Sequence, residues 1–302
     1  NTTGLYDYYG KYTGGYNNVW GNGTDYSRTS AAETDISSDP QYVDAYAVDH
    51  HLLDSSPSKT ASSSGGEIGA YGNGGAPPDS DEELSTTPTL TGALTQSERW
   101  TGEVTLTGSV EVNWPYKLII DAGTVIHMPS SATLTVNNFV RILGTESSPV
   151  VFEAAEGATN WSGIYLNSSG AGSTIRYAHI SDATYCIRSQ GAPDEINNNR
   201  LSNCQYGVYV NSGSPDISNN LIIENAYAGI HVNNGNPQIT YNTLDQNGNY
   251  GVYFSTSVVP TITNNIITRN TTGLYDYYGK YTGGYNNVWG NGTDYSRTSA
   301  AE

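Results

Sequence analysis

Positive charge is scarce in this sequence of 302 residues, which contains twelve Lys and Arg against 29 Asp and Glu and carries a formal net charge of −17 at pH 7. Binding to a phosphate backbone needs a basic surface, so this balance argues against nucleic acid as a partner. No apolar run approaches the ~18–20 residues that cross a bilayer, and we therefore expect no membrane span. The sequence has one Met and two Cys, so it can form at most one internal disulfide.

Charged residues of both signs make up only 14% of the chain, whereas Gly contributes 34 residues and Tyr 25. This composition argues against helical bundles and coiled coils, which need Ala, Leu, Glu and Lys in quantity. It also argues against a disordered chain, because hydrophobic residues reach 36% and aromatic residues 11%. An acidic chain that opens at Asn1 without Met or a signal peptide suggests a processed product, or a window on a longer protein, located outside the cell or on its surface.

A long segment occurs twice in the sequence. Residues 1–33 reappear letter for letter as residues 270–302, so that Asn1 corresponds to Asn270 and Glu33 to Glu302. Shared structural constraint preserves a pattern and not every surface residue, so the identity indicates a repeating array or a polymer. An engineered duplication is the alternative. Whether successive units are covalently continuous or associate without a covalent link stays open at this point.

A second, shorter period runs inside the long one, with a length of about 22 residues. The pattern Gly-apolar-aromatic recurs at equal intervals of this length, at Gly207, Gly229, Gly251 and Gly273. An Ile column recurs at nearly the same interval, at Ile175, Ile196, Ile217, Ile239 and Ile262. An Asn column follows it at Asn199, Asn220, Asn242 and Asn265.

These columns predict an all-β fold, a right-handed parallel β-helix with coils of about 22 residues. Each coil supplies short strands that pair with the coils above and below, ~4.8 Å away. Alternation directs Val208 and Val210 inward and Tyr209 outward. Stacked Ile and Val columns then form a core that no single coil can bury alone. Asn at one corner of successive coils can adopt left-handed backbone geometry and hydrogen-bond to its copies, as a ladder.

Short motifs connect the sequence to a known family. They include Trp-Thr-Gly at residues 100–102, Asp-Ala-Gly-Thr-Val at residues 121–125 and Trp-Ser-Gly-Ile at residues 161–164. In these motifs the chain resembles the secreted right-handed parallel β-helix proteins of bacterial and archaeal surfaces, a pectate-lyase-like group of solenoids. An exit signature of this group, which includes residues 17–23 and 67–72, lies near the N-terminus. The resemblance implies the fold but no single activity, because lyases, hydrolases, adhesins and scaffolds share it.

The order of these signatures predicts three segments. Residues 1–75 hold the C-terminal coils and exit segment of one β-helix unit, and residues 76–98 form an acidic linker rich in Pro, Ser and Thr. Residues 99–302 hold the N-terminal and central coils of the next unit. We therefore expect a non-enzymatic structural repeat unit of an extracellular filament, sheath or long adhesin, assembled by end-to-end stacking with copies of itself. The alternative is a secreted carbohydrate-binding or polysaccharide-cleaving β-helix protein.

Aromatic residues are the candidates for contact surfaces. The predicted outward column of aromatic side chains comprises Tyr165, Tyr209, His231 and Tyr253, with Arg188 between the first two. A row of this kind serves packing or a subunit interface more often than contact with glycans. It offers no carboxylate pair for acid–base chemistry, so no catalytic residue is predicted. The predicted assembly interface comprises Trp100 and a repeated tyrosine-rich loop with Tyr6, Tyr8, Tyr9, Tyr12, Tyr275, Tyr277, Tyr278 and Tyr281.

The remaining polar features predict little chemistry. No cofactor is expected, and a Ca²⁺ site on adjacent loops, suggested by the near alignment of Asp194 and Asp216, is the only metal alternative. Cys186 and Cys204 lie near each other in neighbouring coils, and two buried thiols are favoured over a disulfide between them. Glycosylation sequons occur at Asn1, Asn22, Asn160, Asn167, Asn270 and Asn291.

Overall fold

The structure, a computed structural model, describes residues 2–9, 12–13, 15–44, 49–52, 55–61, 84–167, 172–191, 194–256 and 258–298. The chain divides into two compact units, residues 1–83 and residues 84–302. In the described part of the chain, no helix has the length and apolar character that a bilayer crossing requires.

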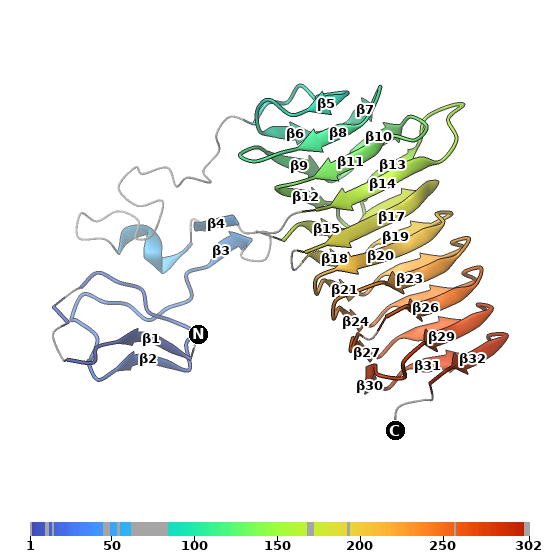
Figure 1. The fold of residues 1–302 in the computed structure, drawn as a ribbon. Helices are drawn as coiled ribbons and strands as arrows, with labels where there is room; N and C mark the ends of the chain where they lie inside the picture. The colour runs from blue at the N-terminus through green and yellow to red at the C-terminus, as the bar shows by residue number, and fades with distance from the viewer. Residues whose placement is uncertain are drawn as a thin grey trace. The chain divides into compact units, whose positions relative to one another are not determined.

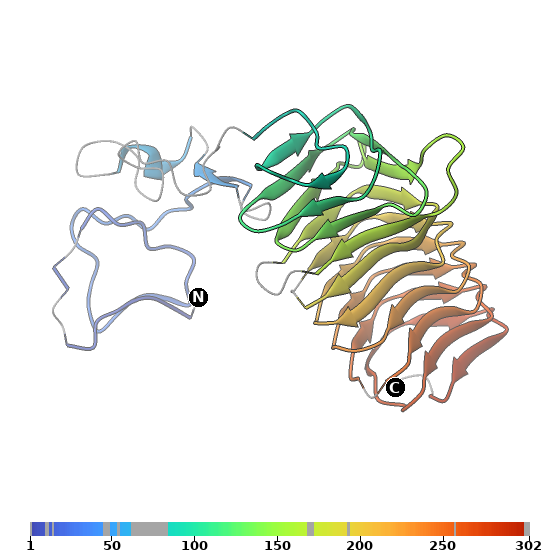
Figure 2. The same cartoon turned by 45° about the horizontal axis from the view of Figure 1, so that its top comes forward.

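The second unit is a parallel β-solenoid whose successive coils stack like rungs (Figures 1 and 2). Each coil contributes one strand to each of three sheets, always in the same order. The first sheet holds β6 (Glu98–Trp100), β9 (Lys117–Asp121), β12 (Phe139–Leu143), β15 (Thr174–Arg176), β18 (Glu195–Asn197), β21 (Asp216–Ser218), β24 (Gln238–Thr240), β27 (Thr261–Thr263) and β30 (Thr282–Gly284). The second sheet holds β7 (Glu103–Thr105), β10 (Val125–Met128), β13 (Val150–Ala154), β16 (Ala178–Ser181), β19 (Arg200–Ser202), β22 (Leu221–Ile223), β25 (Thr243–Asp245), β28 (Ile266–Thr268) and β31 (Asn287–Trp289). The third sheet holds β5 (Gly92–Ala93), β8 (Val110–Val112), β11 (Thr133–Val136), β14 (Trp161–Leu166), β17 (Ala183–Gln190), β20 (Tyr206–Ser212), β23 (Ala228–Val232), β26 (Tyr250–Phe254), β29 (Thr272–Asp276) and β32 (Thr293–Ser296).

The core confirms the fold predicted from the short period. The five Ile residues of the predicted column lie side by side in the first sheet, each with no exposed surface. Val208 and Val210 of β20 are likewise fully buried, and Tyr209 between them faces outward. Burying a side chain of this size stabilises a fold by about 1.5–3 kcal/mol. Because each inward residue packs on its copies above and below, this stabilisation depends on the stack and not on any single coil.

The solenoid begins earlier than the sequence predicted. Residues 84–98 were assigned to the linker, but Leu94 is buried and β5 and β6 pair in the sheets. Ser85 forms a parallel bridge with Glu98, whose buried carboxylate accepts the N–H of Thr89 at 2.9 Å. The boundary between the units therefore falls before Leu84. The acidic start of the predicted linker, residues 76–83, lies outside the described residues.

The first unit contains a short parallel stack followed by an antiparallel hairpin. Strands β1 (Thr3–Tyr6) and β2 (Thr24–Ser27) pair in parallel, and β3 (Tyr42–Asp44) and β4 (Asp49–Leu52) pair antiparallel. A 3-10 helix, η1 (Pro57–Thr60), follows, and the Ser56 side chain accepts the N–H of Ser58 at its start. The predicted exit motif at residues 67–72 lies outside the described residues.

Candidate functional site

An aromatic row follows the outward face of the third sheet. The residues that occupy one position on six successive strands are, in order, Tyr165, Arg188, Tyr209, His231, Tyr253 and Tyr275. Ring centroids lie 4.8 Å apart for Tyr209 and His231 and 4.6 Å apart for His231 and Tyr253. The four residues predicted for an outward column thus stand in one continuous row. The coil spacing brings the rings into contact because parallel strands lie ~4.8 Å apart.

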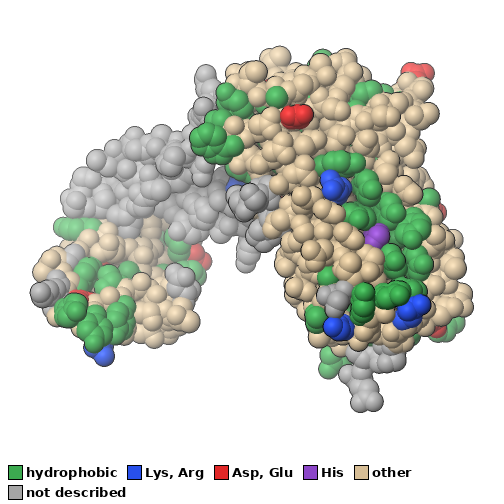
Figure 3. Space-filling model, in the orientation of Figure 1, with side chains coloured by type: hydrophobic (Ala, Val, Ile, Leu, Met, Phe, Trp, Pro, Cys, Tyr) green, Lys and Arg blue, Asp and Glu red, His purple; other side chains and the backbone are tan. Residues whose placement is uncertain are grey.

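A second row of tyrosines, which was not predicted from the sequence, stands beside the first. It comprises Tyr185, Tyr206, Tyr227 and Tyr250, whose successive centroids lie 5.2, 5.1 and 5.6 Å apart. Three of these residues directly precede Cys186, Gly207 and Gly251, which share one position of the repeated strand pattern. The 22-residue period could therefore have predicted this second row. We call the two rows together the aromatic stripe. Figure 3 shows this gathering of hydrophobic side chains around one histidine, with cationic side chains at its margins.

Two arginines accompany the stripe, Arg188 within its first row and Arg297 over its last ring, Tyr275. The guanidinium carbon of Arg188 lies 5.1 Å from the Tyr165 ring, and that of Arg297 lies 4.3 Å from the Tyr277 ring. Burial lowers the pKa of His231 to about 4, and the Nε2 of its ring lies 3.2 Å from the Ser255 hydroxyl. Burial also raises the pKa of the Tyr209 phenol. At neutral pH the stripe therefore offers aromatic faces and hydroxyl groups, and neither a carboxylate nor a charged imidazole among its own side chains.

A row of amide side chains runs along the stripe on the same sheet. Asn137 Nδ2 donates to Asn113 Oδ1 at 2.7 Å, and Asn211 Nδ2 donates to Gln190 Oε1 at 2.8 Å. Further along, the Ser255 hydroxyl donates to Asn233 Oδ1 at 3.2 Å. The outward face of the third sheet thus combines stacking surfaces with hydrogen-bonding groups, which are the two elements that recognise sugars or another protein surface.

The predicted Asn ladder is present inside the solenoid. The Nδ2 of Asn220 donates to Asn242 Oδ1 at 2.9 Å and to the Ile196 carbonyl at 2.8 Å. The same pattern links Asn199, Asn220, Asn242, Asn265 and Asn286. The left-handed backbone, however, lies one residue earlier than predicted, for example at Asn219 with φ 55°. The turn at that residue places the ladder amide under the neighbouring coil, where it satisfies buried backbone groups.

A second Asn ladder, also not predicted from the sequence, lines another corner. It comprises Asn225, Asn247, Asn270 and Asn291, linked at 2.9–3.1 Å. Opposite these amides stand Gly207, Gly229, Gly251 and Gly273, where a Cβ atom would come within 2.7–3.2 Å of the amide nitrogen. At Gly207, Gly229 and Gly251 the added Cβ would also lie 2.6–2.8 Å from the carbonyl oxygen of the glycine in the next coil. The close backbone approach and the ladder amide together explain why Gly recurs in the strand pattern.

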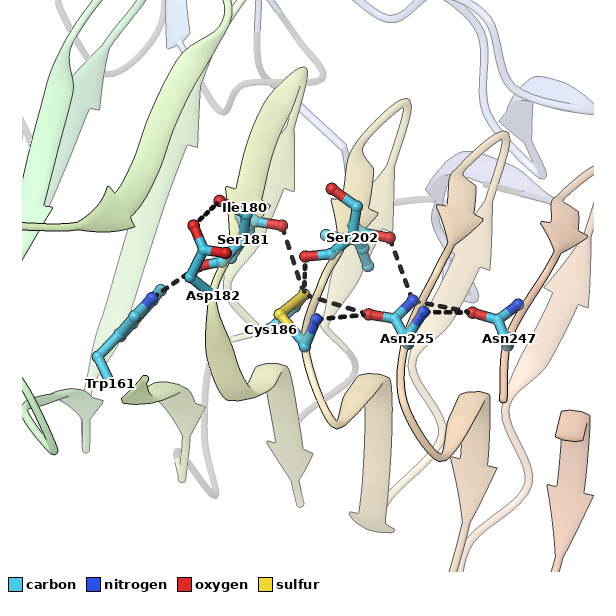
Figure 4. The surroundings of a disulfide bond; sticks show 10 residues. Trp161, Ile180, Ser181, Asp182, Cys186, Ser202, Asn225 and Asn247 are labelled. Atoms are coloured by element: carbon cyan, nitrogen blue, oxygen red, sulfur yellow. Dashed lines mark hydrogen bonds between the residues drawn. A yellow bond between two sulfur atoms is a disulfide. The ribbon is translucent and has the colours of Figure 1, made fainter. Parts of the chain in front are cut away.

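Cys186 and Cys204 form a disulfide, with their Cα atoms 5.8 Å apart. The prediction of two buried thiols was therefore wrong. The two cysteines continue the Gly–Asn series, since Cys186 takes the glycine position and Cys204 the amide position one coil earlier. The Cys204 N–H still donates to Asn225 Oδ1 at 3.1 Å, as an amide of the ladder would. Figure 4 shows Cys186 beside the amides of Asn225 and Asn247. The cross-link thus replaces a contact that needed a small residue on one side.

Each copy of the repeated segment forms a coil of its own, and the strand pairing is equivalent in the two coils. In the first copy Thr3 pairs with Thr24 and Leu5 with Tyr26, and in the second copy Thr272 pairs with Thr293 and Leu274 with Tyr295. Residues that pair in the first copy thus have equivalents that pair with each other in the second copy. The second copy packs on β26 of the preceding coil, whereas the first copy is followed by Ile36, which bridges Asn18 in parallel. The coil keeps its register in both settings.

Side-chain contacts are also repeated between the copies. Asn22 Nδ2 donates to Asp25 Oδ1 at 3.2 Å in the first copy, and Asn291 Nδ2 donates to Asp294 Oδ1 at 3.0 Å in the second. In the tyrosine-rich loop, Asp7 accepts the N–H of Tyr9 at 3.1 Å, and the equivalent Asp276 accepts the N–H of Tyr278 at the same distance. The loop geometry is therefore a property of the coil itself.

The predicted assembly residues divide into exposed and buried groups. Tyr6, Tyr8, Tyr9, Tyr277 and Tyr278 are exposed by 45–79%. Tyr12 is partly buried and donates its hydroxyl to Asp35, while Tyr275 lies in the stripe and Tyr281 packs against the core. Trp100 was wrongly placed in this set. It is fully buried, and its indole N–H donates to Glu98 at 2.7 Å, so it belongs to the core at the first coil.

The predicted glycosylation sites differ in how far their Asn side chains are exposed. Asn160 is exposed, whereas Asn270 is only 3% exposed and its Nδ2 donates within the second ladder. A folded coil cannot present Asn270 to a glycosylating enzyme, so that prediction is wrong for the folded chain. Asn22, Asn167 and Asn291 are partly buried, and Asn1 lies outside the described residues.

The carboxylates behind the Ca²⁺ alternative do not converge. Asp194 is fully buried and accepts the Ser189 hydroxyl at 2.6 Å, and burial raises its pKa to about 6. Asp216 is exposed and its register partner is Glu195. Within the described residues, no group of three or more His, Cys, Asp and Glu side chains is placed to hold a metal ion.

An open groove of about 380 Å³ lies outside the second sheet, lined by Glu146, Tyr177, His179, Arg200 and neighbouring residues. Burial and the nearby Arg200 lower the pKa of His179. None of these residues was predicted as a site from the sequence.

Comparison with known proteins supports the fold. A family described as right handed beta helix region matches residues 162–300. The searches of curated proteins and of solved structures returned no match. The matched residues carry the aromatic stripe, both Asn ladders and the disulfide. With its parallel three-sheet coils, the second unit has the fold of a right-handed parallel β-helix, and the family match over residues 162–300 supports this fold.

Proposed function

We propose that this chain is a non-enzymatic structural repeat unit of an extracellular filament, sheath or long adhesin, assembled by end-to-end stacking of β-helix coils. The observation that carries the proposal is the coil that forms twice in the same register, once with a neighbour on its preceding side and once with a neighbour on its following side. A coil that accepts neighbours on both faces is a repeating element of a continuous stack.

The pairing inside the solenoid is consistent with this role. In all three sheets the strands of successive coils pair in parallel and in the order of the sequence, so that inner coils have a neighbour on each side. A stack of this kind can add coils without a change in geometry. The buried disulfide also fits an extracellular location, because disulfides persist in oxidising compartments.

Electron microscopy of the purified chain tests the proposal. One full repeat of the sequence, minus a linker, corresponds to about eleven coils and an axial period of about 50–60 Å at ~4.8 Å per coil. We expect fibres with this period and a meridional reflection near ~4.8 Å in fibre diffraction. Monodisperse short rods at all concentrations would contradict the proposal.

The aromatic stripe and its amide row favour a second candidate, a secreted carbohydrate-binding or carbohydrate-cleaving β-helix protein. Aromatic faces stack on sugar rings, and flanking amides bond to hydroxyl groups. Affinity electrophoresis in gels that contain soluble polysaccharides tests this candidate, with Tyr209→Ala as the matched variant. Retardation that the substitution abolishes would favour glycan binding, and unchanged mobility of both chains would count against it.

A further inference from the structure

Arg200 is a cation without a counter-charge in the groove outside the second sheet. It stands on β19 and lines the groove of about 380 Å³ beside His179 of β16, its register partner in the preceding coil. Glu146 lines the same groove, but in the described part of the chain Arg200 forms no ion pair with it or with any other carboxylate. A guanidinium presents paired N–H groups that fit a carboxylate. The groove therefore suits a carboxylate that another molecule supplies.

Two carboxylates without a counter-charge lie on the first sheet, at the same height along the solenoid. Glu195 of β18 and Asp216 of β21 are register partners, and both side chains are exposed. Like charges directly opposite each other in a sheet are unfavourable, and among the described residues neither of these two forms an ion pair. Glu195 and Arg200 belong to the same coil, on either side of the corner at residues 198 and 199. We call Glu195 and Asp216 the carboxylate pair.

We propose that the carboxylate pair of a second copy of this chain enters the groove at Arg200, so that parallel solenoids associate side by side. This inference rests on the proposed function and specifies the lateral partner and the contact. Because the carboxylate pair and the groove lie on different sheets, each copy offers its first sheet to one neighbour and its second sheet to another. A heterologous contact of this kind continues from copy to copy, as a sheath of adjacent solenoids requires.

Exposed apolar side chains continue the groove along the second sheet. Leu221 lines the groove and is 37% exposed, and Ile266, two coils further in the same outward row, is 46% exposed. Tyr241 is 62% exposed and has a left-handed backbone, φ 58°, at the corner position that Asn198 and Asn219 hold in earlier coils. A bulky side chain in this conformation costs energy, which a contact with a partner offsets. Tyrosine and arginine are enriched in protein interfaces, so this face has the composition of a contact between proteins.

The overall charge makes the contact selective. Each copy carries a net charge of −17, so two copies repel each other wherever acidic faces meet. Complementary charges fix the orientation of a contact more than they add affinity. Arg200 and the carboxylate pair therefore determine which faces of two copies meet, while Leu221 and Ile266 supply apolar area to bury.

Charge exchange between two variants of the full chain tests the contact. Arg200→Glu and Glu195→Arg/Asp216→Arg should each reduce side-by-side association at least tenfold, measured by light scattering and as the fraction of laterally paired fibres in electron micrographs. A one-to-one mixture of the two variants should restore the association, because each altered face then meets its complement in the other variant. Restoration also shows that both variants are folded. A mixture that stays as dispersed as its two components would overturn the proposal.

Matched variants control for net charge. Lys117→Glu changes the charge by as much as Arg200→Glu, and Glu111→Arg/Glu156→Arg by as much as the other variant, at positions that do not line the groove. Both controls should leave lateral association unchanged, and an equal loss in controls and test variants would overturn the contact. If fibres of the unmodified chain never pair, end-to-end stacking stands and the lateral contact is removed. If short rods associate side by side with the same exchange pattern but no fibres form, the contact stands and the filament proposal fails.

Discussion

Cys186 and Cys204 are bonded at the place where each following coil sets a glycine against a ladder amide. The equivalent pair in the next coil is Gly207 and Asn225, and the sequence separation is 18 residues in both pairs. The disulfide and the Gly–Asn contact thus occupy equivalent positions, and each connects two adjacent coils. One joins adjacent coils covalently, and the other joins them through an amide that bonds to buried carbonyl groups.

The double variant Cys186→Gly/Cys204→Asn should fold and extend the second ladder by one coil. Reduction of the parent chain is expected to lower its free energy of unfolding by about 3 kcal/mol, because the bridge closes a loop of this length. The double variant should retain more than half of that stability and respond to reductant by less than about 0.5 kcal/mol. Urea unfolding with and without dithiothreitol measures both effects. Cys186→Ala/Cys204→Ala serves as the control, and equal stability of the two variants would contradict the ladder extension.

Asn220→Ala should break the first ladder in the middle of the solenoid. The substitution leaves the Ile196 carbonyl and the amide groups of Asn199 without their partner. Since each buried polar group left unpaired costs about 1–3 kcal/mol, we expect a loss of about 3 kcal/mol in the free energy of unfolding. Hydrogen exchange should show faster opening of the strands on both sides. The exposed Asn249→Ala is the matched control and should change the stability by less than about 0.5 kcal/mol. A similar loss in both variants would disprove a special role of the ladder.

Two buried groups should give opposite pH dependences. The raised pKa of Asp194, about 6, means that its contribution to stability is complete below about 3.8 and is lost as the pH rises through 6. The lowered pKa of His231, about 4, means that its contribution is complete above 6.5 and is lost as the pH falls toward 4. Between pH 7 and pH 5 the two effects oppose each other, the Asp194 effect by about 1 kcal/mol and the His231 effect by about 2 kcal/mol.

Single substitutions should therefore reveal the two slopes. Asp194→Asn is expected to lose stability on acidification from pH 7 to pH 5, because the His231 effect is no longer compensated. His231→Tyr, which continues the row between Tyr209 and Tyr253, is expected to gain stability over the same range. Urea midpoints at pH 5, 6 and 7 provide the measurement. Parallel pH profiles for both variants would show that burial does not perturb these groups as described.

Removal of exposed rings from the tyrosine-rich loops should affect lateral association and not folding. Tyr9 is 79% exposed and Tyr278 is 51% exposed. We expect Tyr9→Ser/Tyr278→Ser to change the free energy of unfolding by less than about 0.5 kcal/mol and to yield fibres that bundle less. Fibre width in electron micrographs is the readout. Tyr241→Ser, at another exposed tyrosine, is the control, and equal bundling of all three proteins would remove the loops from the assembly proposal.

Regular coils were predicted from the sequence and irregular ones were not. The Ile column and the first Asn ladder were predictable because each coil repeats the same local geometry, so spacing translates directly into register. The start of the solenoid before residue 99 was missed because Leu94 packs there without a periodic pattern. The disulfide was missed because two cysteines in neighbouring coils are compatible with either state until the distance between their Cα atoms is known.

The sequence by itself determined the solenoid, its coil length and the identity of the two end segments, since a period and a repeat can be counted without coordinates. Only the tertiary structure decided which side chains meet across coils. It brought two tyrosine rows into one stripe, buried Trp100 and Asn270, and set the cysteines against each other. The reason is that stacking converts residues one coil apart in the sequence into neighbours, and corner geometry decides whether each side chain points inward, outward or along the stack.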